Sequence, residues 1–266
     1  MAPSRVLRER VAGQSAMFDV VTAQTVAPRQ SRVARIFGIS PLTFQSRSFY
    51  RGALAELLVG DVLENLGQRW DVLHDVPLRS GSLDHLVIGP AGVFAVHTAH
   101  CSGVDVTIDG DSLIVVAETR DDILVARAEA EEASQLLAVA VGRPVVVSPL
   151  LVVVDPKRLI MKSPASGVRI IASADIERLL GSAPHTLSGD DVAFISDVAD
   201  LDATWPAAGT TALDTQELHR DFGLIRARVR SALVRRIAWA AVATGVVYLS
   251  VCTVIAAFVS IMMTSP

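Results

Sequence analysis

The spacing of apolar residues predicts a regular series of helices and strands through the first half of the chain. Residues 50–66 carry leucines and valines at three- and four-residue spacing, which predicts an amphipathic helix. Three short apolar runs follow at residues 70–76, 82–88 and 92–97, separated by glycine-containing turns. Such close spacing predicts an antiparallel meander. An Asp-Gly dipeptide at residues 109–110 then predicts a further hairpin.

The pattern changes after residue 120. Residues 122–141 are rich in Ala, Glu and Leu and predict a helix, which should end at the Gly-Arg-Pro sequence that follows. Residues 145–154 are an almost unbroken run of Val and Leu, typical of a strand buried on both faces. A short strand at 168–171 and helices at 174–180 and 190–201 complete the series. The order of elements predicts an α/β fold with a mixed sheet flanked by helices.

The C-terminal residues predict a membrane anchor. No Asp, Glu, Lys or Arg occurs from residue 237 to the end, and residues 237–263 are almost entirely apolar. A bilayer core needs about 20 apolar helical residues, so this stretch is long enough to span. The alternative is a hydrophobic helix docked into a soluble domain, but a helix without a polar face has no side for solvent.

Charge is distributed very unevenly along the chain. Residues 1–50 carry seven arginines against Glu9 and Asp19, a net charge of +5, and residues 220–236 also carry +5. Because the whole chain has a net charge of −4, residues 51–219 carry −14. Arginines next to a membrane span collect on the cytoplasmic side, so we expect a single-pass cell-membrane protein with its N-terminal domain in the cytoplasm. Only the last three residues should emerge on the far side.

These charges also indicate partners. An acidic body makes nucleic acid an unlikely partner, since binding to phosphates is driven by Lys and Arg. The basic flanks favour the anionic lipid bilayer. For the N-terminal flank, a solvated tail and membrane contact remain equal alternatives. The predicted organisation is a basic segment at 1–45, partly disordered or helical, a domain at 46–205, a linker and basic juxtamembrane helix at 206–236, and the transmembrane helix at 237–263.

Several classes of chemistry find no support in the sequence. It has no glycine-rich phosphate loop, no Ser/His/Asp arrangement and no dinucleotide fingerprint, so no cofactor is expected. No signal peptide is expected either, because no apolar run follows the basic residues at the N-terminus. Cys101 and Cys252 are too few for a disulfide framework, which fits a reducing cytosol.

Two strand motifs resemble a known family. They are Leu-Asp-His-Leu-Val at residues 83–87 and Gly-Val-Phe at residues 92–94, preceded by a helix with an acidic residue near its start. This pattern resembles the nuclease-related domain, NERD, a branch of the restriction-endonuclease-like PD-(D/E)xK fold. The resemblance extends from residue 51 to residue 205, more weakly after residue 120. It implies the family's fold and an expectation of nucleic-acid processing.

The resemblance also implies which residues would form the site. Asp84 matches the strand Asp that holds a divalent metal, and Glu56 matches the acidic residue of the helix. The Glu-x-Lys triplet, in which Glu is a metal ligand and Lys helps to activate water, falls on residues 97–99. Here the Glu is His97 and the Lys is Ala99. Asp84 and His97 are therefore candidate metal ligands, but alanine cannot supply the missing cation.

This departure favours a catalytically inactive domain that acts as a scaffold, recruiting a protein partner or serving as a subunit of a membrane complex. The alternative is an active metal-dependent nuclease whose rearranged site uses Asp84, Glu56 and His97. A third possibility comes from His85, His97 and Cys101, since zinc sites use these ligand types. Their spacing matches no structural zinc pattern, and separate histidines are the better interpretation.

Overall fold

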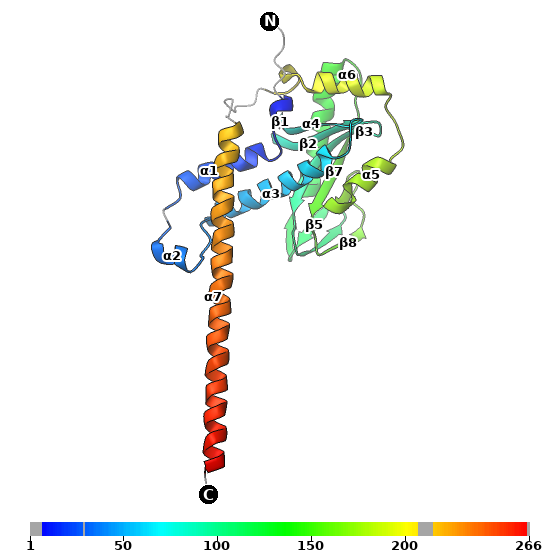
Figure 1. Ribbon diagram of the computed structural model, residues 1–266. Helices are drawn as coiled ribbons and strands as arrows, with labels where there is room; N and C mark the ends of the chain where they lie inside the picture. Colours follow the sequence, from blue (N-terminus) through cyan, green and yellow to red (C-terminus); the bar gives the residue numbers. More distant parts are fainter. Residues whose placement is uncertain (1–6, 29, 207–214, 265–266) are drawn as a thin grey trace.

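The computed structural model describes residues 7–28, 30–206 and 215–264, which form two sheets, the helices around them and one very long helix (Figure 1). The start of the predicted basic segment, residues 207–214 of the predicted linker and the last two residues of the predicted exit from the membrane lie outside these residues. The fold is α/β with mixed sheets flanked by helices, as the order of the apolar patterns predicts.

The larger sheet has five strands in the order β1-β2-β3-β7-β9. Strands β1, β2 and β3 form the predicted antiparallel meander, whereas β7 runs parallel to β3 and β9 parallel to β7. The strands are β1 Asp71–Leu78, β2 Gly81–Gly89, β3 Gly92–His100, β7 Val147–Val154 and β9 Arg169–Ala172. Both faces of β7 are buried, which confirms the expectation from its unbroken apolar sequence.

Helices cover both faces of this sheet. One face packs against α3 (Phe44–Glu64) and α5 (Ile176–Ser182), and the other against α4 (Asp122–Val141) and α6 (Gly189–Ala199). Helix α3 begins six residues earlier than the apolar pattern predicts, because the Thr43 side chain caps it by accepting the Ser46 N–H.

A second sheet of four strands, in the order β6-β5-β4-β8, lies beyond the end of the first. Its strands are β6 Glu118–Arg120, β5 Ser112–Val115, β4 Asp105–Asp109 and β8 Arg158–Ser163. The predicted hairpin is the β4–β5 pair, and its turn glycine, Gly110, has a φ of 58°. Strands β6 and β8 do not appear in the apolar pattern, because most of their residues are exposed.

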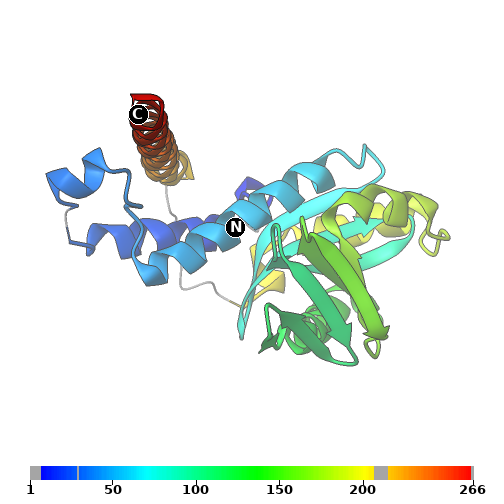
Figure 2. The ribbon, with the colours of Figure 1, turned by 90° about the horizontal axis from the view of Figure 1, so that it is seen from below.

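The N-terminal segment is folded against the long C-terminal helix. Helices α1 (Gln14–Thr25) and α2 (Arg32–Ile36) follow a short 3₁₀ turn, η1 (Leu7–Glu9). Helix α1, α3 and the first turns of α7 (Thr215–Thr264) share an apolar cluster apart from the sheet core. The buried members of this cluster are Met17, Val20, Leu42, Tyr50, Ala53, Leu218, Phe222 and Ile225. Seen from below, α7 stands beside the N-terminal helices and away from both sheets (Figure 2).

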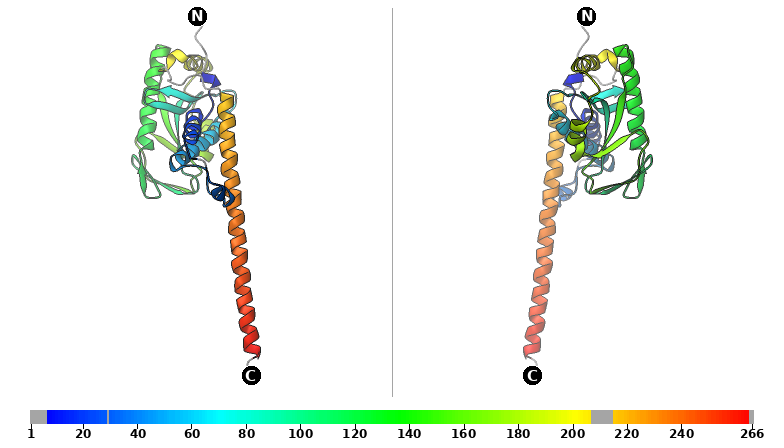
Figure 3. Two further views of the ribbon diagram at one scale, coloured as in Figure 1. Left: turned by 90° about the vertical axis from the view of Figure 1, so that its left-hand side faces the viewer. Right: turned by 90° about the vertical axis from the view of Figure 1, so that its right-hand side faces the viewer.

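Helix α7 has 50 residues, which at 1.5 Å per residue makes it about 75 Å long. Its first turns lie against the domain and the rest projects freely beyond it (Figure 3). Its most apolar stretch is not covered by any other part of the structure. Helix α7 is therefore the one helix among the described residues that is long and apolar enough to cross a membrane.

Candidate functional site

The predicted site residues lie where strands β2 and β3 separate. The pairing of these strands runs from Gly89 opposite Gly92 to His85 opposite Val96 and stops there. Asp84 and His97 are the next residues on the two strands. The backbone N–H of Thr98 donates a hydrogen bond of 2.6 Å to Asp84 Oδ2, which ties the carboxylate to β3 across the opening.

The strand alternation breaks at Asp84. Leu83 and Leu86 both pack into the apolar cluster beneath α4 and α6, although residues three apart on a regular strand face opposite sides. The phase of β2 therefore changes between them. On β1 the pairing skips Asp75, between the pairs His74–His85 and Val76–Leu83, and Asp75 has a φ of 50°, a conformation that residues other than glycine rarely adopt. Such irregularities re-aim side chains and are common next to functional sites.

His97 is surrounded by carboxylates. Its Nδ1 lies 3.0 Å from Glu129 Oε2, and its Nε2 lies 3.8 Å from Asp122 Oδ1. Asp84 Oδ2 is 4.0 Å from Nδ1. Glu129 and Asp122 both belong to α4, which crosses the face of β3 at this point. The imidazole is 17% exposed, so these contacts are made largely away from solvent.

This environment decides the charge of the imidazole. Burial alone would lower the pKa of His97, but its pairing with Asp122 and Glu129 and the nearby Asp84 raise that pKa well above the usual value. The surrounding carboxylates therefore favour the imidazolium form of His97. Burial also opposes ionisation of Asp122, yet His97 and the guanidinium of Arg120 lower the pKa of this carboxyl.

Asp84 and Glu56 show the opposite behaviour. Burial, and to a smaller degree Glu129, raise the pKa of Asp84 to about 6, against the lowering effects of His97 and of the Thr98 N–H. Glu56 reaches the same region from α3, on the other face of the sheet. Burial raises its pKa well above the usual value, and the charges of Asp84, Asp75 and Glu129 raise it further. The structure thus brings all three predicted site residues together.

Ala99, at the position where the family has a lysine, is part of the apolar core. Ala99 is fully buried and packs with Leu151, Val153 and Ile123 beneath the start of α4. Two arginines near the site are already paired with carboxylates. The Arg120 guanidinium lies 2.5 Å from Asp122 Oδ1 and also donates to the His100 carbonyl.

Arg10 is likewise paired with a carboxylate, that of Asp75 on β1. Its guanidinium lies 2.9 Å from Asp75 Oδ2 and also donates to the Asp75 carbonyl oxygen. Neither arginine therefore offers a free cation at the point where the carboxylates meet.

The fit of these residues to a divalent metal is poor. A ligating histidine must be neutral, whereas His97 is held as an imidazolium by carboxylates that would otherwise be ligands. In residues 7–28, 30–206 and 215–264, no group of three or more His, Cys, Asp or Glu side chains is placed so as to hold a metal ion.

The other histidines and Cys101 lie in separate environments. His74 and His85 share a hydrogen bond of 2.8 Å between their Nδ1 atoms, and His74 Nε2 lies 3.2 Å from Glu64. Burial lowers the pKa of both rings, so they form a neutral buried pair. Cys101 is buried near Arg120.

Two carboxylates of the site, Glu129 and Asp122, are absent from the sequence-based prediction. A signal for Glu129 exists in the sequence. It falls within the buried stripe of α4 formed by Ala126, Ala130 and Ala133, where a charged residue breaks the apolar pattern. Asp122 carries no such signal, because an acidic residue in the first turn of a helix is ordinary.

Comparison with known proteins agrees with the geometry. Residues 51–154, from the first turns of α3 to the end of β7, match the family model of the nuclease-related domain. No curated protein and no solved structure matches the chain at a significant level. The chain therefore contains a nuclease-related domain, NERD, over residues 51–154.

Proposed function

We propose that this chain is a membrane-anchored, cytoplasm-facing nuclease-like domain that does not cleave nucleic acid and instead binds a protein partner at the membrane, alone or as a subunit of a membrane complex. The observation that carries the proposal is the state of the Glu-x-Lys positions. His97 occupies the Glu position and is tied to Glu129, and Ala99 occupies the Lys position within the core.

The loss of a cation at this place matters for chemistry. Phosphodiester cleavage places negative charge on the phosphate, and removing a single preorganised group that stabilises such charge typically slows an enzyme by about 10²–10³. Several carboxylates around one imidazolium provide no substitute, because they repel a phosphodiester. The charge of the whole domain acts in the same direction, since residues 51–219 carry −14.

Anchoring through α7 is supported by composition and by charge. The apolar stretch of α7 begins directly after Arg235 and Arg236, and arginines of this kind mark the cytoplasmic end of a span. An anionic inner leaflet attracts nearby arginines by about 1 kcal/mol each. The domain would then be held at the membrane surface, where a protein partner of the same membrane can reach it.

The proposal is tested by a cleavage assay on the full chain in lipid nanodiscs. Single- and double-stranded DNA and RNA would each be incubated with Mg²⁺, Mn²⁺ or Zn²⁺, with Asp84→Ala as the matched variant. We expect no cleavage above the level of Asp84→Ala under any condition. Metal-dependent cleavage that disappears in Asp84→Ala would overturn the proposal.

One observation favours a second candidate, an active metal-dependent nuclease with a rearranged site. Glu129 brings a carboxylate next to His97, and the charges of Asp84 and Glu129 both act on Glu56, so carboxylates from three elements share this region. In that case Glu129 would replace the missing Glu of the triplet. This candidate requires that Glu129→Gln abolish cleavage as completely as Asp84→Ala, while Glu131→Gln, which removes an exposed carboxylate on the same helix, leaves it unchanged.

A further inference from the structure

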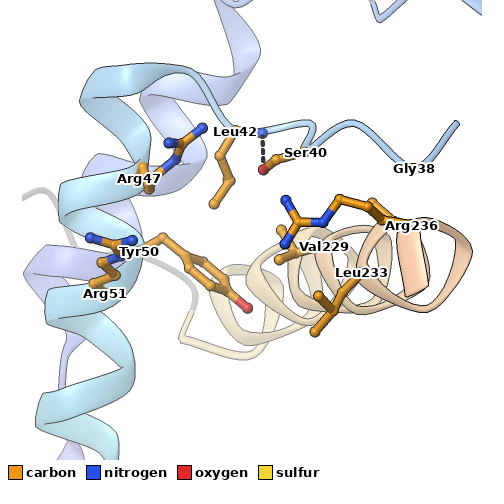
Figure 4. A pocket seen from close by; sticks show the side chains of 10 residues that line it. Gly38, Ser40, Leu42, Arg47, Tyr50, Arg51, Val229, Leu233 and Arg236 are labelled. Atoms are coloured by element: carbon orange, nitrogen blue, oxygen red, sulfur yellow. Dashed lines mark hydrogen bonds between the residues drawn. The ribbon is translucent and has the colours of Figure 1, made fainter. Parts of the chain in front are cut away.

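A pocket lies between the N-terminal segment and α7, just before α7 becomes wholly apolar (Figure 4). Its volume is about 290 Å³. Tyr50 extends from α3 toward α7, and the Arg236 guanidinium extends from α7 back toward α3. The loop between α2 and α3 closes the third side with Ser40 and Leu42.

The pocket is strongly basic. Arg47 and Arg51 from α3 and Arg236 from α7 line it, and no acidic residue does. Within the part of the chain that the structure describes, none of these three arginines forms an ion pair with a carboxylate. In the domain, by contrast, most arginines are paired with Asp or Glu, as Arg10 and Arg120 are.

Contacts between this loop and α7 fix the position of the pocket along α7. Trp239 Nε1 donates a hydrogen bond of 2.9 Å to the Ile36 carbonyl oxygen, and the Trp239 and Phe37 rings lie 5.1 Å apart. Gly38 packs directly on α7, because a Cβ there would lie 2.5 Å from the Arg236 backbone nitrogen and would also overlap the Ala232 carbonyl. The loop is therefore level with residues 232–239 of α7.

This level is where a spanning α7 would meet the lipid headgroups. Arg236 is the last charged residue before the apolar stretch, and Trp239 follows within one helical turn. Tryptophan is enriched at the boundary between the headgroups and the hydrocarbon. Large apolar side chains on α2 and the following loop are exposed at the same level, which suits insertion among lipids. They are Val33, Ile36, Phe37 and Ile39.

We propose that this pocket binds the phosphate group of an anionic phospholipid of the bilayer that α7 spans. The inference rests on the membrane anchoring proposed above. Guanidinium groups form paired, charge-assisted hydrogen bonds with phosphate oxygens, and three unpaired arginines offer several such donors. The Ser40 and Tyr50 hydroxyls add further donors, and Leu42, Val229 and Leu233 supply apolar walls for the glycerol and the first acyl carbons.

The bound lipid would do more than attach the chain. It would bridge α3, which carries Glu56 of the nuclease-related domain, to α7. It would therefore act together with the apolar cluster of α1, α3 and α7 in fixing the orientation of the domain relative to the membrane surface.

The test compares two variants with the same change in charge. Arg47→Gln/Arg51→Gln removes two pocket arginines, whereas Arg228→Gln/Arg230→Gln removes two exposed arginines of α7 that do not line the pocket. Each full chain would be purified in mild detergent with added phosphatidylglycerol or phosphatidylcholine, and bound lipid would be counted by native mass spectrometry. Alkaline carbonate extraction of membranes would be carried out on the same three proteins.

We expect the wild type and the Arg228/Arg230 variant to retain one phosphatidylglycerol in preference to phosphatidylcholine, and the Arg47/Arg51 variant to bind it at least about tenfold more weakly. An equal loss in both variants would overturn the proposal, since it would indicate general attraction to charge. Displacement of the lipid by millimolar inorganic phosphate would also overturn it, by making free phosphate the ligand. Release of the wild type by carbonate would instead overturn the anchoring itself, whereas retention without a bound phosphatidylglycerol would overturn only the pocket.

Discussion

At the scale of single residues, the site is dominated by an imidazolium among carboxylates. The resemblance to nuclease-related domains predicts Asp84, Glu56 and His97, and the structure brings these three together. It does not predict Glu129 or Asp122, because their approach to His97 depends on how α4 crosses β3, and no local pattern encodes that crossing. The electrostatic state of His97 follows from those two residues, so it could not be predicted from the sequence either.

The raised pKa of Asp84 has a consequence for stability. In the unfolded chain this carboxyl has a pKa of 3.8, and in the folded protein a pKa of about 6. The folded state therefore holds its proton more tightly, and the penalty for ionising Asp84 grows as the pH rises from about 4 to about 6 and is complete above that range. A shift of this size corresponds to up to about 3 kcal/mol.

We therefore expect Asp84→Asn to unfold at a higher temperature than the wild type at pH 7.5 and at a similar temperature at pH 4. Thermal unfolding of the full chain in detergent at the two pH values measures this difference. Glu131→Gln, which removes an exposed carboxylate of α4, serves as the control and should change neither midpoint. A larger loss of stability in Asp84→Asn at pH 7.5 than at pH 4 would show that ionised Asp84 stabilises the fold.

At the scale of elements, short-range signals predict more than long-range ones. The meander and the β4–β5 hairpin follow from turn residues that lie beside the strands they connect. Strand β8 could not be predicted, because its partner β4 lies about fifty residues away and its own side chains are mostly exposed. The packing of Ala12, in the turn before α1, on α3 could not be predicted either. It depends on Gly60, which in the sequence is only a helix-weakening residue.

Gly60 allows the N-terminal segment to approach α3 closely. A Cβ at this position would lie 2.5 Å from the Ala12 Cβ and 3.5 Å from both His74 and His85. Replacing glycine by alanine in a helix normally stabilises it by up to about 1 kcal/mol. At Gly60 the overlap should outweigh that gain, and we expect Gly60→Ala to destabilise the protein by about 1–3 kcal/mol.

Gly223→Ala provides the matched control. Gly223 lies within α7 with nothing within 4 Å of its would-be Cβ, so the same substitution there should leave stability unchanged or raise it slightly. Urea unfolding of the two variants in detergent separates the effects. Equal stabilisation by both substitutions would mean that Ala12 does not pack on α3 as described.

At the scale of the whole molecule, composition predicts the division into an acidic domain, basic flanks and an apolar helix. It does not predict that the two basic flanks lie together, because they are separated by the entire domain in the sequence. The apolar cluster shared by α1, α3 and the start of α7 joins them and sets the domain beside the first turns of α7, before its apolar part begins (Figure 1). Arg47, which lines the pocket beside α7, is thus brought near the proposed membrane surface, whereas Arg8 and Arg10 pair with carboxylates of the domain.

This arrangement predicts that the whole domain lies on the cytoplasmic side of the membrane. In sealed membrane vesicles with the cytoplasmic face outward, protease should digest the domain and leave a protected fragment that contains the apolar part of α7. In vesicles of the opposite orientation the domain should survive intact. Digestion of the domain from the extracytoplasmic face would reverse the proposed orientation, and disappearance of the protected fragment would exclude a span.

The proposed function implies that the site around His97 does not bind a divalent metal. The most direct test is a calorimetric titration of Mn²⁺ into the full chain in nanodiscs at pH 7.5, alongside Asp84→Ala. We expect no saturable heat that distinguishes the two proteins. A stoichiometric binding isotherm that is lost in Asp84→Ala would contradict it and would make the carboxylates around His97 a working metal site.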